Sequence, residues 1–110
     1  MNTAWKAFER EIARLLGGRR FPANSGYTID VESSGFIAQC KLVRTCSLHA
    51  LSDLAEQVDR DAAGKFKSGV VAVKLRRGRG KPSPILMVVT ARTWEELHGT
   101  PPPPAGTGAL

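Results

Sequence analysis

The middle of the chain constrains the fold most. Two apolar runs, 36–43 and 69–75, flank residues 48–63, where apolar positions recur at helical spacing. Ser47 is a suitable N-cap for that helix, and Gly64 is a suitable end. A helix between two strands permits a right-handed crossover and a mixed sheet. We therefore expect a small α/β domain, or an α+β variant of it, with a mixed β-sheet flanked by helices.

Further elements are expected on both sides of this unit. Residues 3–16 have the amphipathic pattern of a helix, which Gly17-Gly18 ends. Residues 27–32 alternate between apolar and polar, and Ser33-Ser34-Gly35 predicts a β-hairpin with the run 36–43. The remaining expected elements are a loop at 19–26, a strand at 85–89 and a helix at 94–98 capped by Thr93.

Length and composition indicate one folded domain. The chain has 110 residues, of which 42% are hydrophobic, and we divide it into a domain at 1–98 and a Pro/Gly-rich disordered tail at 99–110. No apolar run approaches the roughly 18–20 residues that cross a bilayer, and the first residues lack the apolar core of a signal peptide. We expect a cytoplasmic protein with no membrane partner, whose two cysteines are reduced.

The positive charge is strong and uneven. The chain has 16 Lys and Arg against 10 Asp and Glu, a net charge of +6, and no acidic residue lies between Gly64 and Pro84. Such clustering is typical of a surface that binds a polyanion, although a solvated basic loop has the same pattern. The residues that we expect to contact DNA phosphates on this basis are Arg19, Arg20, Lys74, Arg76, Arg77, Arg79 and Lys81.

A small polar group follows from the expected hairpin. Asp30 lies on the first strand, and Gln39 and Lys41 share one face of the second because they are two residues apart. If the strands pair, a carboxylate and an amide oxygen can hold Mg²⁺, and the lysine can orient or deprotonate water and stabilise a phosphoryl transition state. Glu9 on the first helix can add a carboxylate. The alternative is a solvated polar strand face.

These residues stand in a recognisable order. Residues 5–97 resemble the archaeal-type Holliday-junction resolvases of the PD-(D/E)xK nuclease superfamily. The resemblance implies a restriction-endonuclease-like fold and a Mg²⁺-dependent endonuclease, with Mn²⁺ as a substitute, that acts as a homodimer on four-way DNA junctions. The motifs that carry it are Phe8-Glu9-Arg10-Glu11, Arg20-Phe21-Pro22-Ala23-Asn24-Ser25-Gly26, Ile29-Asp30 and Ala38-Gln39-Cys40-Lys41.

The resemblance also implies roles for single residues. Glu9 corresponds to a helix glutamate that helps to bind metal, and Asp30 to the central metal-binding aspartate. Lys41 corresponds to the catalytic lysine. Ser25, or its neighbour Asn24, lies in the loop where a serine approaches the scissile phosphate.

Gln39 is the main departure from the family pattern, which has Glu or Asp at this position. A glutamine offers a neutral oxygen, so metal affinity should fall while coordination remains possible. Two alternatives therefore stay open. One is a DNA-binding relative without catalytic activity, and the other is a restriction or repair nuclease of the same fold.

Overall fold

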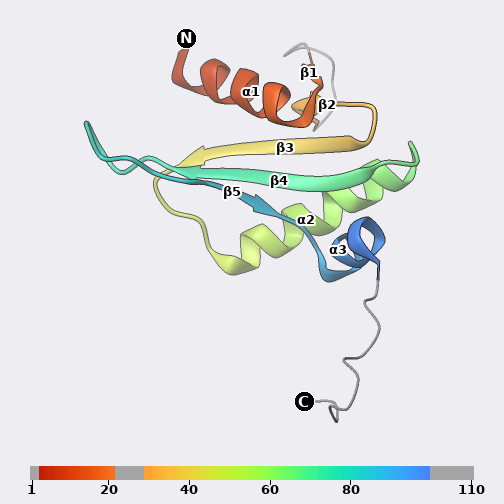
Figure 1. Cartoon of the computed structure of the whole chain (residues 1–110). Helices are drawn as coiled ribbons and strands as arrows, with labels where there is room; N and C mark the ends of the chain where they lie inside the picture. The colour runs from red at the N-terminus through yellow and green to blue at the C-terminus, as the bar shows by residue number, and fades with distance from the viewer. Residues whose placement is uncertain (1–2, 22–28, 100–110) are drawn as a thin grey trace, which may run out of the picture.

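A computed structural model provides the structure of the chain and describes residues 3–21 and 29–99. Three helices and five strands form a small α/β fold, as the sequence predicts (Figure 1). In chain order the elements are α1 (Thr3–Leu16), β1 (Arg19–Arg20), β2 (Val31–Glu32), β3 (Phe36–Val43), α2 (Leu48–Ala63), β4 (Ser68–Leu75), β5 (Ile85–Val88) and α3 (Ala91–His98).

The sheet is mixed, and its strands lie in sequence order from β1 to β5. β3 and β4 are parallel and in register from Phe36 opposite Ser68 to Val43 opposite Leu75, whereas the other pairs are antiparallel. The crossover between the parallel strands is α2. The hairpin of β2 with β3 and a crossover within a mixed sheet were expected from the sequence, and the structure confirms them.

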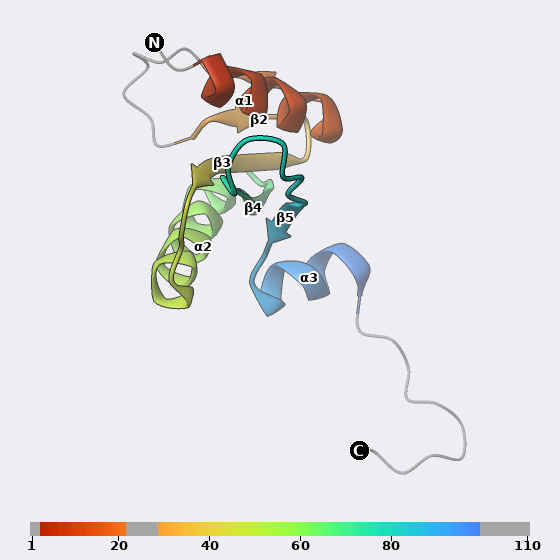
Figure 2. The same ribbon diagram turned by 90° about the vertical axis from the view of Figure 1, so that its left-hand side faces the viewer.

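The helices cover both faces of the sheet. α1 packs on one face and α2 on the other (Figures 1 and 2). The strand β3 contributes to both cores because its side chains alternate: Cys40 packs in the cluster with Phe8 and Ile12 of α1, and Ile37 in the cluster with Val58 of α2. This strand is therefore covered on both faces, which its apolar sequence predicts.

The bounds of α2 follow from its caps. The Ser47 hydroxyl accepts a hydrogen bond from the Ala50 main-chain N–H at 3.0 Å, and Gly64 is the C-cap. The helix lies close to β4 because Gly69 has no side chain; a Cβ there would lie 2.7 Å from the Val58 carbonyl oxygen. The sequence predictions for this helix are confirmed at both ends.

Three local predictions are wrong or incomplete. Arg19–Arg20 form the short strand β1 rather than the start of a loop, because they pair with β2. The strand predicted at 27–32 is limited to Val31–Glu32 within the described residues. Thr90 caps α3 in place of Thr93, since its hydroxyl accepts from the Thr93 main-chain N–H at 3.2 Å and the helix begins at Ala91.

A buried carboxylate of α2 forms hydrogen bonds that hold α3 against the rest of the fold. Asp59 of α2 accepts hydrogen bonds from the hydroxyls of Thr90, at 2.5 Å, and Thr93, at 2.9 Å. Gly99 ends α3, and residues 100–110 of the predicted tail lie outside the described part of the chain. In the described part of the chain, no helix is both long and apolar enough to cross a membrane.

Candidate functional site

A β-bulge positions the Asp30 carboxyl group. The main-chain N–H of Asp30 donates to the Ala38 carbonyl at 3.0 Å, although Val31 is already paired with Ala38. Two residues thus oppose one, which is the arrangement of a bulge and redirects the side chain. Asp30 Oδ2 accepts a hydrogen bond from the Cys40 main-chain N–H at 2.8 Å. The carboxylate therefore lies against β3 at the residue between Gln39 and Lys41.

Glu9 lies in a second polar contact on the α1 side of the sheet. Its Oε1 atom is 2.8 Å from Nη2 of Arg20 and accepts from Nε of the same residue at 2.9 Å. Its Oε2 atom accepts from the Trp5 indole N–H at 2.6 Å. Glu9 is buried, and a buried carboxylate is stable only when it is hydrogen-bonded or paired. Trp5 of α1 and Arg20 of β1 provide these partners.

The charges of Glu9 and Arg20 influence the pKa of Asp30. Burial raises the pKa of Asp30, and the hydrogen bond from Cys40 lowers it. The negative charge of Glu9 raises the same pKa further, while the positive charges of Lys41 and Arg20 lower it. We call Glu9, Arg20, Asp30 and Lys41 the charged group: Glu9 and Arg20 are in contact, and Asp30 is influenced by the charges of the other three residues without a hydrogen bond or ion pair to them among the described residues.

Gln39 is less closely connected to this group. Gln39 and Lys41 alternate with Cys40, which packs in the α1 core, so they extend from the face on which Ile37 meets α2. The bulge turns Asp30 toward the Cys40 main chain instead of leaving it directly beside Gln39. The predicted convergence of Asp30 with Gln39 and Lys41 therefore stays a prediction, since the hydrogen bond of Asp30 to β3 goes to Cys40.

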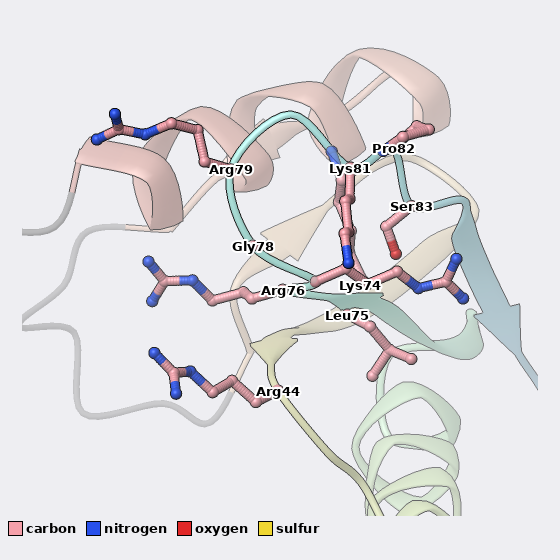
Figure 3. Close-up of a pocket in the computed structure, with 10 residues that line it drawn as sticks. Arg44, Lys74, Leu75, Arg76, Gly78, Arg79, Lys81, Pro82 and Ser83 are labelled. Carbon is pink, nitrogen blue, oxygen red and sulfur yellow. The ribbon is translucent and has the colours of Figure 1, made fainter.

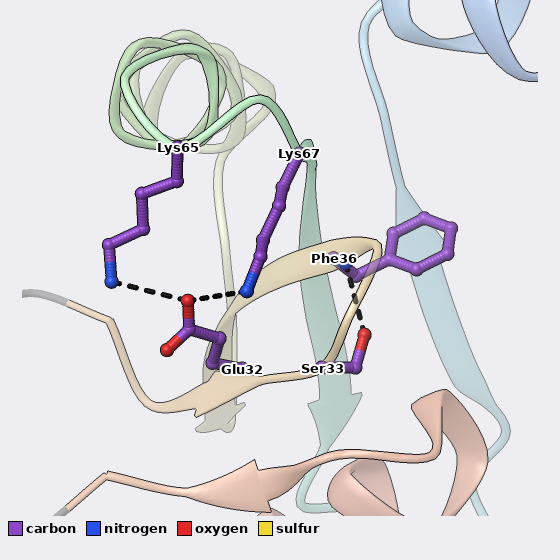
Figure 4. Close-up of polar contacts among 5 residues, drawn as sticks. All are labelled: Glu32, Ser33, Phe36, Lys65 and Lys67. Carbon is purple, nitrogen blue, oxygen red and sulfur yellow. Dashed lines mark hydrogen bonds and ion pairs between the residues drawn. The ribbon is translucent and has the colours of Figure 1, made fainter.

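Glu32 is occupied by another interaction. Its Oε2 atom lies 3.2 Å from Nζ of Lys65 and 2.6 Å from Nζ of Lys67 (Figure 4). Both lysines follow the end of α2. The hydrogen bond from Lys67 is the main reason that the pKa of Glu32 is lowered. Glu32 therefore ties the end of α2 to β2 and is not part of the charged group around Asp30.

The donor set suits Mg²⁺ only in part. Asp30 has a second oxygen with no hydrogen bond or ion pair to a described residue, whereas Glu9 can become a ligand only after Arg20 or Trp5 has moved. Among residues 3–21 and 29–99, no three His, Cys, Asp or Glu side chains are grouped to hold a metal. Magnesium is often held by one or two carboxylates with water and substrate phosphates. Asp30 can provide one such carboxylate, and no contact among the described residues brings the Gln39 amide to it.

The predicted phosphate contacts fall into two groups. Arg19 is exposed, but Arg20 is half-buried and paired with Glu9, so its charge is already partly neutralised. The other five line a hollow of about 730 Å³ around the loop from β4 to β5, which we call the basic pocket (Figure 3). Its lining comprises Arg44, Lys74, Leu75, Arg76, Arg77, Gly78, Arg79, Lys81, Pro82 and Ser83.

Two residues of the basic pocket were not expected from the sequence. Arg44 follows β3 directly and was not recognised because its neighbours in the chain are not basic. Its position after the strand that leads into the predicted crossover to β4 was the available signal. Ser83 carried no signal at all, since a serine between two prolines is ordinary loop sequence.

Ser25 and Asn24 lie outside the described residues, so the structure does not test their predicted place near the scissile phosphate. No known family model, curated protein or solved structure matches this chain.

Proposed function

We propose that this chain is a Mg²⁺-dependent DNA endonuclease with a restriction-endonuclease-like fold, which resolves four-way junctions by phosphodiester hydrolysis. The observation that carries the proposal is the carboxylate of Asp30, held by the Cys40 main-chain N–H at 2.8 Å, between Gln39 and Lys41. An aspartate directly before β2, a lysine on the antiparallel neighbour β3 and a glutamate on the first helix agree with what the resemblance to the resolvases implies.

The residues would divide the chemistry among them. Asp30 and Gln39 would hold the metal together with oxygens of the substrate phosphate. When bound, Mg²⁺ lowers the pKa of a coordinated water and offsets negative charge on the phosphate. Lys41 would orient the attacking water and stabilise the charge that develops on the phosphate. Glu9 would join this site after exchanging its contact with Arg20, which would free that arginine for the DNA backbone.

Two copies of the chain are part of the proposal, because resolving a junction needs two symmetric cuts. The described surface offers a candidate contact. β5 is an edge strand of the sheet, and it leaves Leu86 and Met87 exposed. On α3, Trp94 and Leu97 are exposed as well. The proposal further puts the protein in the cytoplasm with its DNA.

The decisive experiment is cleavage of a labelled four-way junction by the Asp30→Ala variant in Mg²⁺. We expect cleavage to be lost, because the carboxylate that would hold the metal is gone, while junction binding in EDTA stays near the wild-type value. The matched control is Asp53→Ala, which removes an exposed α2 carboxylate that is ion-paired with His49. Undiminished cleavage by Asp30→Ala would overturn the assigned site.

A specific observation favours a second candidate function. Gln39 is neutral and both Glu9 oxygens are already bonded, so the site holds less negative charge than a metal centre prefers. The chain would then bind DNA without cutting it. This candidate predicts no nicking in Mg²⁺ or Mn²⁺ by the wild type and a gain of cleavage in Gln39→Glu, which restores an acidic ligand.

The same assay separates the resolvase from other nucleases of this fold. A panel of four-way junction, flap and linear duplex, each with Mg²⁺ and with EDTA, reports which DNA is cut. Preference for the junction supports the resolvase. Preference for the linear duplex or the flap would assign a restriction or repair nuclease instead.

A further inference from the structure

The basic pocket lies where two parallel strands end. Val43 of β3 is in register with Leu75 of β4, so the residues that follow them, Arg44 and Arg76, emerge side by side. The Arg76 main-chain N–H donates to the Val43 carbonyl at 2.7 Å and fixes this juxtaposition. Figure 3 shows both guanidinium groups extending in the same direction. The carboxyl ends of adjacent parallel strands are a common place for ligand binding in open α/β sheets.

The charge of the pocket is not compensated by any acidic residue among those that line it in the described part of the chain. Six of its lining residues are basic and none is acidic. None of the six forms an ion pair within the described part of the chain. Like charges held close together repel, and an anion between them removes that cost. The pocket is thus prepared for an anionic ligand.

A second observation points to a hydrogen-bond acceptor in the same place. The Ser83 hydroxyl is shielded from solvent and has no hydrogen-bond partner among the described residues. A buried hydroxyl without a partner costs about 1–3 kcal/mol. Ser83 lines the basic pocket, and its oxygen is directed inward from the loop in Figure 3. A small shift of the loop would let a phosphate oxygen reach this hydroxyl, and that phosphate would then satisfy the hydroxyl and the arginines together.

The size and position of the pocket indicate part of a longer ligand. Its volume of about 730 Å³ lies in the range of about 300–1,000 Å³ that accommodates drug-sized ligands, so it is larger than a lone phosphate ion requires. Lys41 lies near the end of β3 and precedes Arg44 by three residues, a distance of about 10 Å at roughly 3.3 Å per residue of extended chain. That is about three base-pair steps along a duplex.

We infer that the basic pocket binds a backbone phosphate of DNA a few nucleotides away from the phosphate that is cut, with Arg44, Arg76 and the Ser83 hydroxyl as its direct contacts. This inference deepens the proposed function and rests on it for the choice of DNA as ligand. The pocket would fix the register of the DNA on the protein without reading its sequence.

The experiment measures binding of a labelled four-way junction and a linear duplex in EDTA, where no cutting occurs, over a series of salt concentrations. We expect Arg44→Gln to weaken binding to both DNAs by about tenfold and to reduce the slope of log K against log salt by about one. The matched control is Arg92→Gln, an exposed arginine on α3 at the opposite end of β4, which should change the dissociation constant less than about twofold.

The Ser83→Ala variant separates a ligand contact from a structural role. We expect it to weaken DNA binding by about threefold without lowering the melting temperature of the free protein, because the hydroxyl has no partner there. A lower melting temperature with unchanged DNA binding would overturn the assignment of Ser83. Equal effects of Arg44→Gln and Arg92→Gln would overturn the pocket as the DNA contact.

Two further measurements test whether the bound phosphate belongs to DNA: competition by inorganic phosphate, and binding of duplex RNA compared with duplex DNA. Inorganic phosphate should compete only weakly, because it fills a small part of the pocket. Efficient displacement of DNA by inorganic phosphate, or tighter binding of duplex RNA than of duplex DNA, would contradict the inference. A separate result would contradict the proposed endonuclease activity. If the wild type binds DNA through Arg44 but does not cut it in Mg²⁺, the basic pocket is a phosphate site and the proposed nuclease activity is wrong.

Discussion

Two opposing effects act on the carboxyl group of Asp30. Burial raises its pKa above the ordinary value of 3.8, and the Cys40 N–H works against this by stabilising the charged form. Burial is the larger effect, so the folded protein binds this proton more tightly than the unfolded chain does. An ionised Asp30 at neutral pH therefore costs stability, which is typical of a group kept for function.

The substitution Asp30→Asn tests this cost. The asparagine keeps a carbonyl oxygen that can accept from the Cys40 N–H but carries no charge. We expect the variant to be more stable than the wild type at pH 7, and the difference to vanish as the pH falls below 3.8, where the wild-type group is protonated in both states. Melting curves recorded between pH 3 and pH 8, in steps of roughly one pH unit, measure this difference in stability. A variant that is less stable than the wild type at pH 7 would contradict the assignment.

The two cysteines should differ in reactivity. Cys40 is fully buried, and burial followed by the negative charges of Asp30 and Glu9 raises the pKa of its thiol to about 12. Cys46 is only half-buried, in the connection between β3 and α2. We expect a thiol reagent at neutral pH to modify one cysteine per native chain and the second only after unfolding. The Cys46→Ser variant should be inert until it unfolds, and rapid modification of that folded variant would refute the prediction.

At the scale of the elements, the attachment of α3 depends on one side chain. Asp59 is buried and accepts from the hydroxyls of Thr90 and Thr93, and Thr90 in turn caps the helix. The last helix makes few other contacts with the sheet, so this network fixes its position. Hydrogen bonds to a charged group contribute about 1.5–3 kcal/mol each, and loss of the acceptor leaves buried donors without a partner.

We therefore expect Asp59→Ala to lower the free energy of unfolding by about 2–3 kcal/mol. The fluorescence of Trp94, which lies on α3, should report loosening of this helix before the rest of the fold is lost. The exposed Asp53→Ala provides the comparison and should change stability by less than about 0.5 kcal/mol. Equal effects of the two substitutions would show that α3 is held by something else.

At the scale of the whole molecule, the excess of positive charge is concentrated at one end of the sheet. The net charge is +6, and the basic pocket gathers six cations at the carboxyl ends of β3 and β4. α3 lies beyond the end of β5, away from this pocket (Figure 2). A second copy bound through β5 and α3 would therefore not have to bring the two basic pockets directly together.

Sedimentation velocity tests the proposed dimer. The chain has a mass of 11.9 kDa, and we expect the wild type to sediment with twice that mass. Met87→Lys places a charge on the exposed edge strand β5 and should shift the population to monomer, because edge lysines disfavour strand pairing. Phe66→Lys, at the exposed apolar residue after α2, is the control. A wild type that remains monomeric at all protein concentrations would exclude the dimer.

Much of the fold was accessible from the sequence because it depends on local patterns. The bounds of α1 and α2 follow from apolar spacing and from Ser47 and Gly64, which act within one turn of the helix. The hairpin of β2 and β3 and the crossover from β3 to β4 follow from connection lengths. The strand β1 was not predicted, because Arg19–Arg20 have no strand pattern of their own and become a strand only by pairing with β2.

The sequence by itself determined the order of elements, the mixed sheet and the place of Gln39 and Lys41 on a strand that pairs with the segment after Asp30. Only the tertiary structure decided how these groups are arranged. The bulge at Asp30, the pairing of Glu9 with Arg20 and the approach of Arg44 to Arg76 all join residues that are distant in the chain. Such contacts depend on packing and on the charge of the surroundings, and neither is encoded in the spacing of residues along one element.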